Sequence, residues 1–151
     1  MREQLLVLNG PNLNALGRRE PEKYGTTSLS SLEETWKAWG QERALVVRTA
    51  QSQFEGELVK ILHTAEEEKQ IGAVVFNPGA YTHTSRALRD AIASLSIPVV
   101  EVHVTNVAAR EEWRRHSMVA EVCAGSIVGL GVQGYLLALT AANHLLTEGT
   151  R

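Results

Sequence analysis

Short hydrophobic runs alternate along the chain with longer stretches in which hydrophobic residues recur every three or four positions. The runs cover residues 5–8, 45–47, 73–76, 98–103 and 122–128. Short apolar runs of this kind are typical of strands that are covered on both faces of a sheet. We therefore expect five strands, with the first of them in a central position.

The intervening stretches predict helices. Their hydrophobic positions recur at helical spacing: Leu29, Leu32, Trp36 and Trp39; Phe54, Leu58, Ile61, Leu62 and Ala65; Leu88, Ala91, Ile92 and Leu95; and Val132, Leu136, Leu139 and Leu146. Ser28 is placed to cap the first of these helices. A further short, charged helix is expected over residues 109–115.

Strands that alternate with helices in this way indicate a parallel sheet with right-handed crossovers and helices on both faces. We expect an α/β protein, a flavodoxin-like three-layer sandwich with a five-stranded parallel sheet, in a single domain over residues 1–151. Ligands of such sheets bind outside the carboxyl ends of the strands.

Composition narrows the class of protein. Hydrophobic residues make up 44% of the chain and the net charge is -2, so neither disorder nor a dominant attraction to nucleic acid or anionic lipid is implied. The single cysteine excludes an intramolecular disulfide. With no basic-then-apolar leader and no apolar run long enough to span a bilayer, a soluble cytoplasmic protein is expected.

Polar residues gather after three of the predicted strands, over residues 9–25, 77–83 and 101–114. The first segment is longer than the structureless loops that compact domains usually keep, which favours a lid or a binding loop. The sequence Asn77-Pro78-Gly79 predicts a type II turn, since proline suits its second position and glycine its third.

Tyr24 is a candidate base. A free phenol has a pKa near ~10, but neighbouring guanidinium charge favours the phenolate. Arg18 and Arg19 could supply that charge. The alternative is a surface tyrosine beside solvated arginines.

His103 is a candidate acid. Glu101 lies two residues earlier on the same strand, so both side chains point to the same side, and a carboxylate can orient an imidazole. A purely structural histidine is the alternative. With His83 the pair could also form a zinc site, although no short histidine motif supports one.

The sequence Gly129-Leu-Gly131-Val-Gln-Gly134 matches the dinucleotide fingerprint. That fingerprint needs a second strand with an acidic residue about 20 residues later, whereas here a helix runs to the end of the chain. We interpret these glycines as a tight turn into a closely packed helix.

The polar segments together resemble the type II 3-dehydroquinate dehydratases over essentially the whole chain. The motifs are Asn9-Gly-Pro-Asn-Leu-Asn14, Gly17-Arg-Arg-Glu-Pro21 with Tyr24-Gly25, Phe76-Asn-Pro-Gly-Ala-Tyr-Thr-His-Thr-Ser85, Glu101-Val-His103 and Arg110-Glu-Glu-Trp-Arg114. The resemblance implies a flavodoxin-like fold and reversible anti dehydration of 3-dehydroquinate to 3-dehydroshikimate in the shikimate pathway. It implies no cofactor and no metal.

Roles follow from the resemblance by matching motif. Tyr24 would remove the proton at carbon 2, Arg19 would favour its phenolate, and Asn12 would hold a water that stabilises the enolate. His103 would protonate the departing hydroxyl, with Glu101 as its orienter. The remaining matches are substrate-binding positions: Asn77, His83, Asp90, Val104, Thr105, Arg110 and Arg114.

The resemblance also implies a homododecamer built from four trimers, with Asp90 contributed across a subunit contact. Some positions depart from the family pattern: Thr105 replaces serine, Trp113 replaces phenylalanine, Ala108 replaces a larger residue, and Gln53-Phe54 replaces Asn-His. These departures concern interface details more than chemistry.

Two further hypotheses about the function remain open. One is a flavodoxin-like binding module without catalysis, and the other is a metal-dependent hydrolase.

Overall fold

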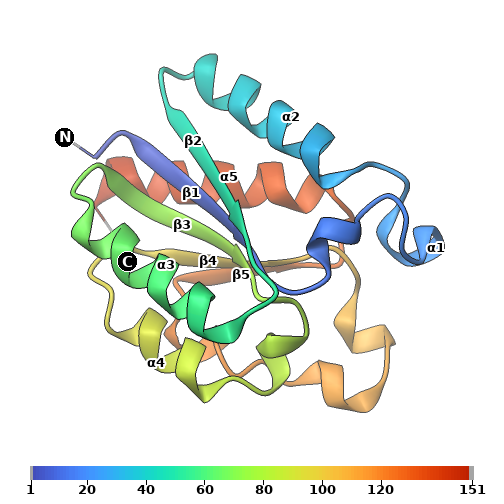
Figure 1. Cartoon of the computed structure of the whole chain (residues 1–151). Helices are drawn as coiled ribbons and strands as arrows, with labels where there is room; N and C mark the ends of the chain where they lie inside the picture. Colours follow the sequence, from blue (N-terminus) through green and yellow to red (C-terminus); the bar gives the residue numbers. More distant parts are fainter. Residues whose placement is uncertain (1, 150–151) are drawn as a thin grey trace.

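A single parallel sheet in the order β2-β1-β3-β4-β5 organises the computed structural model, which describes residues 2–149 (Figure 1). The strands are β1 Gln4–Asn9, β2 Val46–Gln51, β3 Ile71–Asn77, β4 Val99–His103 and β5 Gly125–Val128. The predicted parallel α/β architecture is confirmed. The first strand is interior, paired with β2 and β3, although β3 occupies the middle of the sheet.

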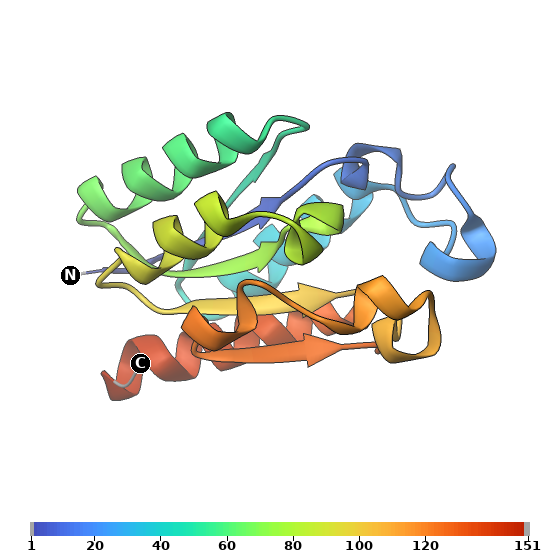
Figure 2. The same cartoon turned by 90° about the horizontal axis from the view of Figure 1, so that it is seen from below.

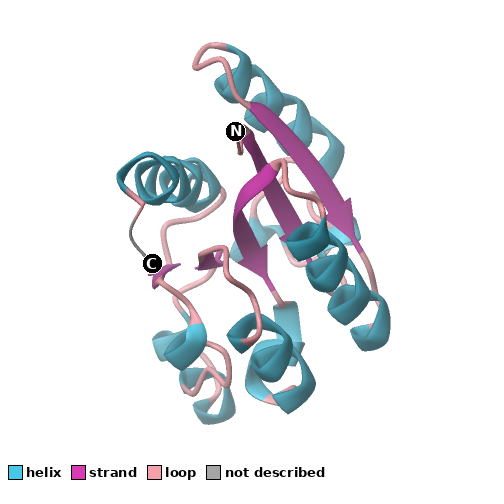
Figure 3. Ribbon diagram, turned by 90° about the vertical axis from the view of Figure 1, so that its left-hand side faces the viewer, coloured by secondary structure: helices cyan, strands magenta, loops and turns pink. Residues whose placement is uncertain are grey.

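Helices cover both faces of the sheet (Figures 1 and 3). α2 (Leu29–Gln41) and α5 (Gln133–Glu148) pack on one face, and α3 (Glu55–Glu67) and α4 (Arg86–Ala93) on the other. Successive side chains of a strand point to opposite faces, so in β1 Leu5 and Val7 enter the first core while Leu6 and Leu8 enter the second. Both faces are therefore buried, which explains the uninterrupted hydrophobic runs.

The segment after β1 is more ordered than a structureless loop. It contains a 3-10 helix, Leu13–Ala15, and the short helix α1, Pro21–Tyr24. Leu13 and Leu16 are buried in the core that also holds α2 and α5. Burial of these two leucines fixes the first half of the segment, so the long loop expected here is partly helical and partly anchored in the core.

The turn after β3 also differs from its prediction. Gly79 has the expected positive φ of 61°, but Pro78 is helical, with φ -73° and ψ -5°, whereas a type II turn requires ψ near ~120° at that position. The chain continues directly into a 3-10 helix, Gly79–His83. The Asn77 carboxamide accepts the Gly79 N–H (3.1 Å) and holds this tight start.

Two predicted elements differ in the structure. The charged helix expected over 109–115 is two 3-10 helices, Val107–Ala109 and Glu112–Arg115. The fifth strand expected over 122–128 begins only at Gly125, and Val122 instead ends another 3-10 helix, Ala120–Val122. Val122 and Cys123 pack against the core beside α3 and α4. Their hydrophobicity therefore reflects burial outside the sheet.

All five strands point toward the same edge of the molecule. There the segment that follows β1 and the segment that follows β4 face each other, as Figure 2 shows at the strand arrowheads. The polar motifs noted in the sequence therefore meet at the carboxyl edge of the sheet, where ligands of such folds bind.

Candidate active site

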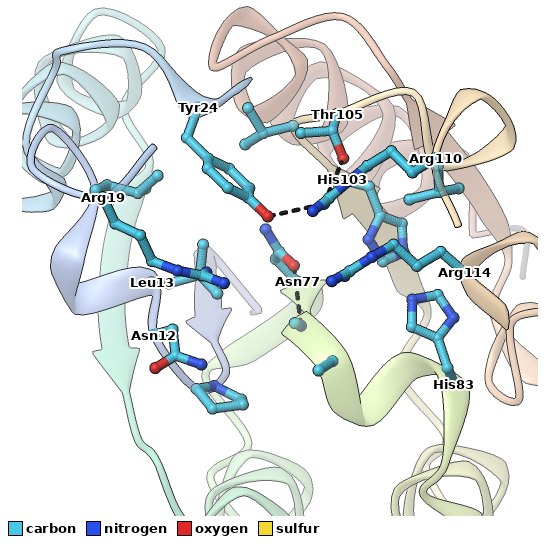
Figure 4. Close-up of a pocket in the computed structure, with 16 residues that line it drawn as sticks. Asn12, Leu13, Arg19, Tyr24, Asn77, His83, His103, Thr105, Arg110 and Arg114 are labelled. Carbon is cyan, nitrogen blue, oxygen red and sulfur yellow. Dashed lines mark hydrogen bonds between the residues drawn. The ribbon is translucent and has the colours of Figure 1, made fainter. Parts of the chain in front are cut away.

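A cleft of about 650 Å³, counting the part open to solvent, lies at the carboxyl ends of β1, β3 and β4 (Figure 4). Its size suits a small molecule. Ten of the predicted site residues line it: Asn12, Arg19, Tyr24, Asn77, His83, His103, Val104, Thr105, Arg110 and Arg114. Three guanidinium groups and no acidic side chain are among the described lining residues, which favours an anionic ligand.

Tyr24 is the last residue of α1 and is half-buried in this cleft. Arg110 Nη1 donates a hydrogen bond to its hydroxyl oxygen at 2.8 Å, and also contacts the Thr105 hydroxyl at 3.4 Å. The guanidinium carbons of Arg19 and Arg110 lie 5.4 and 5.6 Å from the phenol ring centre. Two cations thus flank the phenol. Arg110, expected to bind substrate, is the direct partner of the oxygen.

His103 ends β4 with its ring held by a buried carboxylate. Its Nε2 donates to Glu101 Oε2 at 2.7 Å, so the two side chains lie on the same side of the strand as predicted. Glu101 also accepts hydrogen bonds from the hydroxyls of Ser117 (2.7 Å) and Ser126 (2.8 Å). Burial by itself would raise the pKa of Glu101, but these hydrogen bonds outweigh it and lower that pKa. The carboxylate is therefore ionised and keeps a proton on Nε2.

His83 lies beside His103, with the two ring centres 6.5 Å apart. Its Nδ1 donates to the main-chain carbonyl of His116 at 2.8 Å, and the ring packs edge-on against Trp113 with centres 5.3 Å apart. Burial lowers the pKa of His83, so the ring is neutral at pH 7. With Nδ1 carrying the proton, Nε2 is free to accept a hydrogen bond.

The structure does not support the zinc site that the sequence left open. Among residues 2–149, no three histidine, cysteine, aspartate or glutamate side chains are grouped to hold a metal ion. His83 Nδ1 and His103 Nε2 are both occupied by the hydrogen bonds just described.

A main-chain hydrogen bond of Asn12 fixes the position of this residue in the cleft. It adopts a left-handed conformation with φ 69°, and its N–H donates to Gln53 Oε1 at 2.7 Å. Gln53 Nε2 in turn donates to Asn14 Oδ1 at 3.0 Å. Gln53, noted in the sequence only as a departure at an interface, thus anchors the segment that carries Asn12.

Two predicted site residues lie outside the cleft. Glu101 is not a lining residue and contacts the cleft only through its hydrogen bond to His103. Asp90, on α4, is exposed and pairs with Arg89 at 3.1 Å. Its predicted role needs a second subunit, so this role stays a prediction.

Sequence reasoning missed the apolar part of the cleft. Hydrophobic lining residues that were not predicted are Pro11, Leu13, Leu16, Ala80 and Val107. The spacing of Leu13 and Leu16, one helical turn apart in a polar segment, was the available signal.

The glycines of the fingerprint-like segment form a turn, as predicted. Gly129 and Gly131 have φ of 86° and 66°. A Cβ on Gly129 would lie 3.1 Å from Asn106. The segment leads from β5 into α5, the last helix of the described chain.

Comparison with known proteins decides the family. A sequence model of the family described as dehydroquinase class II matches residues 3–143. The chain belongs to this family. It is 54% identical to a 3-dehydroquinate dehydratase of Bacillus pumilus, covering 95% of both chains. It is 55% identical to one from Deinococcus radiodurans, covering 89% of this chain and 94% of that one.

Solved structures agree with this assignment. A type II dehydroquinase from Butyrivibrio crossotus superposes with a TM-score of 0.91 at 41% identity, covering 94% of this chain and 98% of that one. One from Propionibacterium acnes gives 0.88 at 44% identity, with 97% and 98% covered. The class II dehydroquinase predicted from the motifs is thereby confirmed. Within residues 2–149 no helix has both the length and the hydrophobicity needed to cross a bilayer.

Proposed function

We propose that this class II dehydroquinase catalyses the reversible anti dehydration of 3-dehydroquinate to 3-dehydroshikimate through an enolate, a step of the shikimate pathway. One observation carries the assignment of roles. The Tyr24 hydroxyl and the His103 ring line the same cleft, between three arginines that suit an anionic substrate.

Tyr24 is the base that removes the proton at carbon 2. Arg110, hydrogen-bonded to the phenol oxygen, and Arg19, beside the ring, favour the phenolate that this step needs. Asn12 holds a water that stabilises the enolate oxygen. Positioned hydrogen-bond donors of this kind stabilise charge where it develops.

His103 is the acid that protonates the departing hydroxyl at carbon 1. Glu101 orients the ring by accepting a hydrogen bond from its Nε2–H. Separate groups for the two proton transfers suit an elimination in which the proton and the hydroxyl leave from opposite faces. No cofactor or metal takes part.

The remaining residues bind and orient the substrate. Asn77, His83 and Arg114 contribute side chains, and Val104 and Thr105 contribute their main chain. The active assembly is a homododecamer of four trimers, in which Asp90 reaches the site of a neighbouring subunit. The enzyme acts in the cytoplasm and needs neither nucleic acid nor a membrane.

The proposal is tested by a spectrophotometric assay. Purified enzyme, dialysed against a chelator, should convert 3-dehydroquinate to a product with the ultraviolet absorbance of a conjugated enone. Borohydride added during turnover should leave activity intact, since no imine to a lysine forms. Stoichiometric binding of 3-dehydroquinate without product would instead identify a non-catalytic binding module.

A further inference from the structure

A buried hydrogen-bonded chain lies beneath the cleft. The Tyr135 hydroxyl, on α5, accepts a hydrogen bond from Asn77 Nδ2 at 2.9 Å and donates one to Asn9 Oδ1 at 2.6 Å. The exposed fractions of Tyr135, Asn9 and Asn77 are 0%, 1% and 4%. Tyr135 does not line the cleft, whereas Asn77 does.

The direction of each hydrogen bond is set by the groups available. Tyr135 has a single proton, and Asn9 Oδ1 can only accept. The Tyr135 oxygen must therefore accept from Asn77. At the other end of the Asn77 amide, Oδ1 accepts the main-chain N–H of Gly79 at 3.1 Å. A flipped amide would face the Gly79 N–H with its own NH₂ group and would lose both bonds.

One donor of Asn77 is left over. Its oxygen is committed to Gly79 and one Nδ2 proton to Tyr135, so the second Nδ2 proton is the group that Asn77 can offer to a ligand (Figure 4). The phenol that fixes this arrangement is itself fixed, because the Trp36 ring packs on it with centres 4.5 Å apart. Burial also raises the pKa of Tyr135, so its proton stays in place at neutral pH.

We propose that Tyr135 is a positioning residue of the dehydratase reaction. It orients the Asn77 amide so that one N–H donor, and no acceptor, faces an oxygen of the substrate. The inference rests on the proposed function and extends it to a residue outside the cleft. A donor held in advance contributes to substrate affinity without the cost of ordering it on binding.

Tyr135→Phe keeps the ring and removes only the hydroxyl. We expect KM for 3-dehydroquinate to rise about tenfold with kcat within about twofold, as for loss of an interaction made equally in ground and transition states. Leu139→Val is the matched control, because Leu139 is equally buried on α5 and lies away from the cleft. It should lower the thermal midpoint and leave KM unchanged.

A double-mutant cycle separates positioning from general loosening. In an Asn77→Ala background, Tyr135→Phe should change kcat/KM by less than about twofold, because the group that it orients is gone. Additive effects in the cycle, or an unchanged KM in folded Tyr135→Phe, would overturn the proposal. Wild-type turnover is measured alongside, so that absence of any turnover counts against the proposed function and not against Tyr135.

The wild-type protein supplies a second measurement in case Tyr135→Phe does not fold. Two-dimensional ¹⁵N NMR should show two separate side-chain proton signals for Asn77, one with a nuclear Overhauser contact to the Tyr135 ring. Only the other signal should shift strongly when 3-dehydroquinate is added. Equal shifts of both, or no contact to Tyr135, would contradict the assigned orientation.

Discussion

The proposed chemistry depends most directly on the Tyr24 hydroxyl, which accepts a hydrogen bond from Arg110. Tyr24→Phe removes the base but keeps the ring, so we expect kcat to fall by about 10²–10⁴-fold, the usual contribution of a positioned acid or base. The enone assay measures this loss. Tyr81→Phe is the control, since its hydroxyl donates to the Gln53 carbonyl outside the cleft. Wild-type activity in Tyr24→Phe would remove Tyr24 from the role of base.

The ionised Glu101 carboxylate should make the stability of the folded protein depend on pH in the acid range. Because its pKa in the folded protein lies below the ordinary value of 4.5, its contribution to folding is complete above pH 4.5 and is lost as the pH falls through the lowered value. Glu101→Gln lacks this charge and should be less stable at pH 7, by about 1.5–3 kcal/mol.

Urea unfolding of both proteins across pH checks this prediction. The difference in the free energy of unfolding between wild type and Glu101→Gln should be constant above pH 4.5 and shrink below it. A difference that grows on acidification would contradict an ionised, hydrogen-bonded Glu101.

At the scale of elements, the segment after β1 has two halves with different attachments. Leu13 and Leu16 hold the first half in the core, whereas α1 contains no buried residue. We predict that the second half, residues 17–25, is a lid whose closure brings Tyr24 to the substrate.

Hydrogen exchange tests the lid. On addition of a tight-binding substrate analogue, amide protection should rise over residues 17–25 and change little over residues 13–16, since the leucines already hold that half. Protection that is the same with and without the ligand over residues 17–25 would count against a closing lid.

The two glycines that bound this lid differ in what surrounds them. Gly17 has φ 90° and a Cβ there would lie 2.8 Å from the Thr26 carbonyl oxygen, whereas Gly25 has φ 79° with open space around it. The ψ of Gly25 is -178°, which together with its positive φ is a conformation that only glycine adopts readily, so alanine there carries a backbone penalty of about 1–3 kcal/mol. Alanine at Gly17 adds a steric clash and should lower both the thermal midpoint and kcat/KM further. Equal effects of the two substitutions would contradict this geometry.

At the scale of the whole molecule, hydrophobic side chains remain exposed around the edge strand β5. Leu130 is 57% exposed and Leu137 is 41% exposed. Surface of this kind is common where chains associate. Sedimentation should give a mass about twelve times the 16.5 kDa of one chain, and Leu137→Glu should give smaller species. A wild-type monomer would contradict the proposed dodecamer and the role of Asp90.

Much of the architecture could be predicted from the pattern of hydrophobic residues. Runs buried on two faces and helical stretches with one apolar face have few arrangements other than a parallel sheet between helices. Since parallel strands all end at one edge, polar motifs that follow β1, β3 and β4 had to meet there. The sequence by itself therefore determined the fold class and which segments form the cleft.

The pairing of side chains within the cleft was decided by the tertiary structure. Arg110 reaches Tyr24 across 86 residues of sequence, and Tyr135 reaches Asn9 across 126. Such contacts depend on strand order, register and side-chain direction together, which no local spacing encodes. For the same reason Pro78 adopts a helical conformation where the local sequence favoured a type II turn: the Asn77 carboxamide and the 3-10 helix that follows outweigh the intrinsic preference of the turn residues.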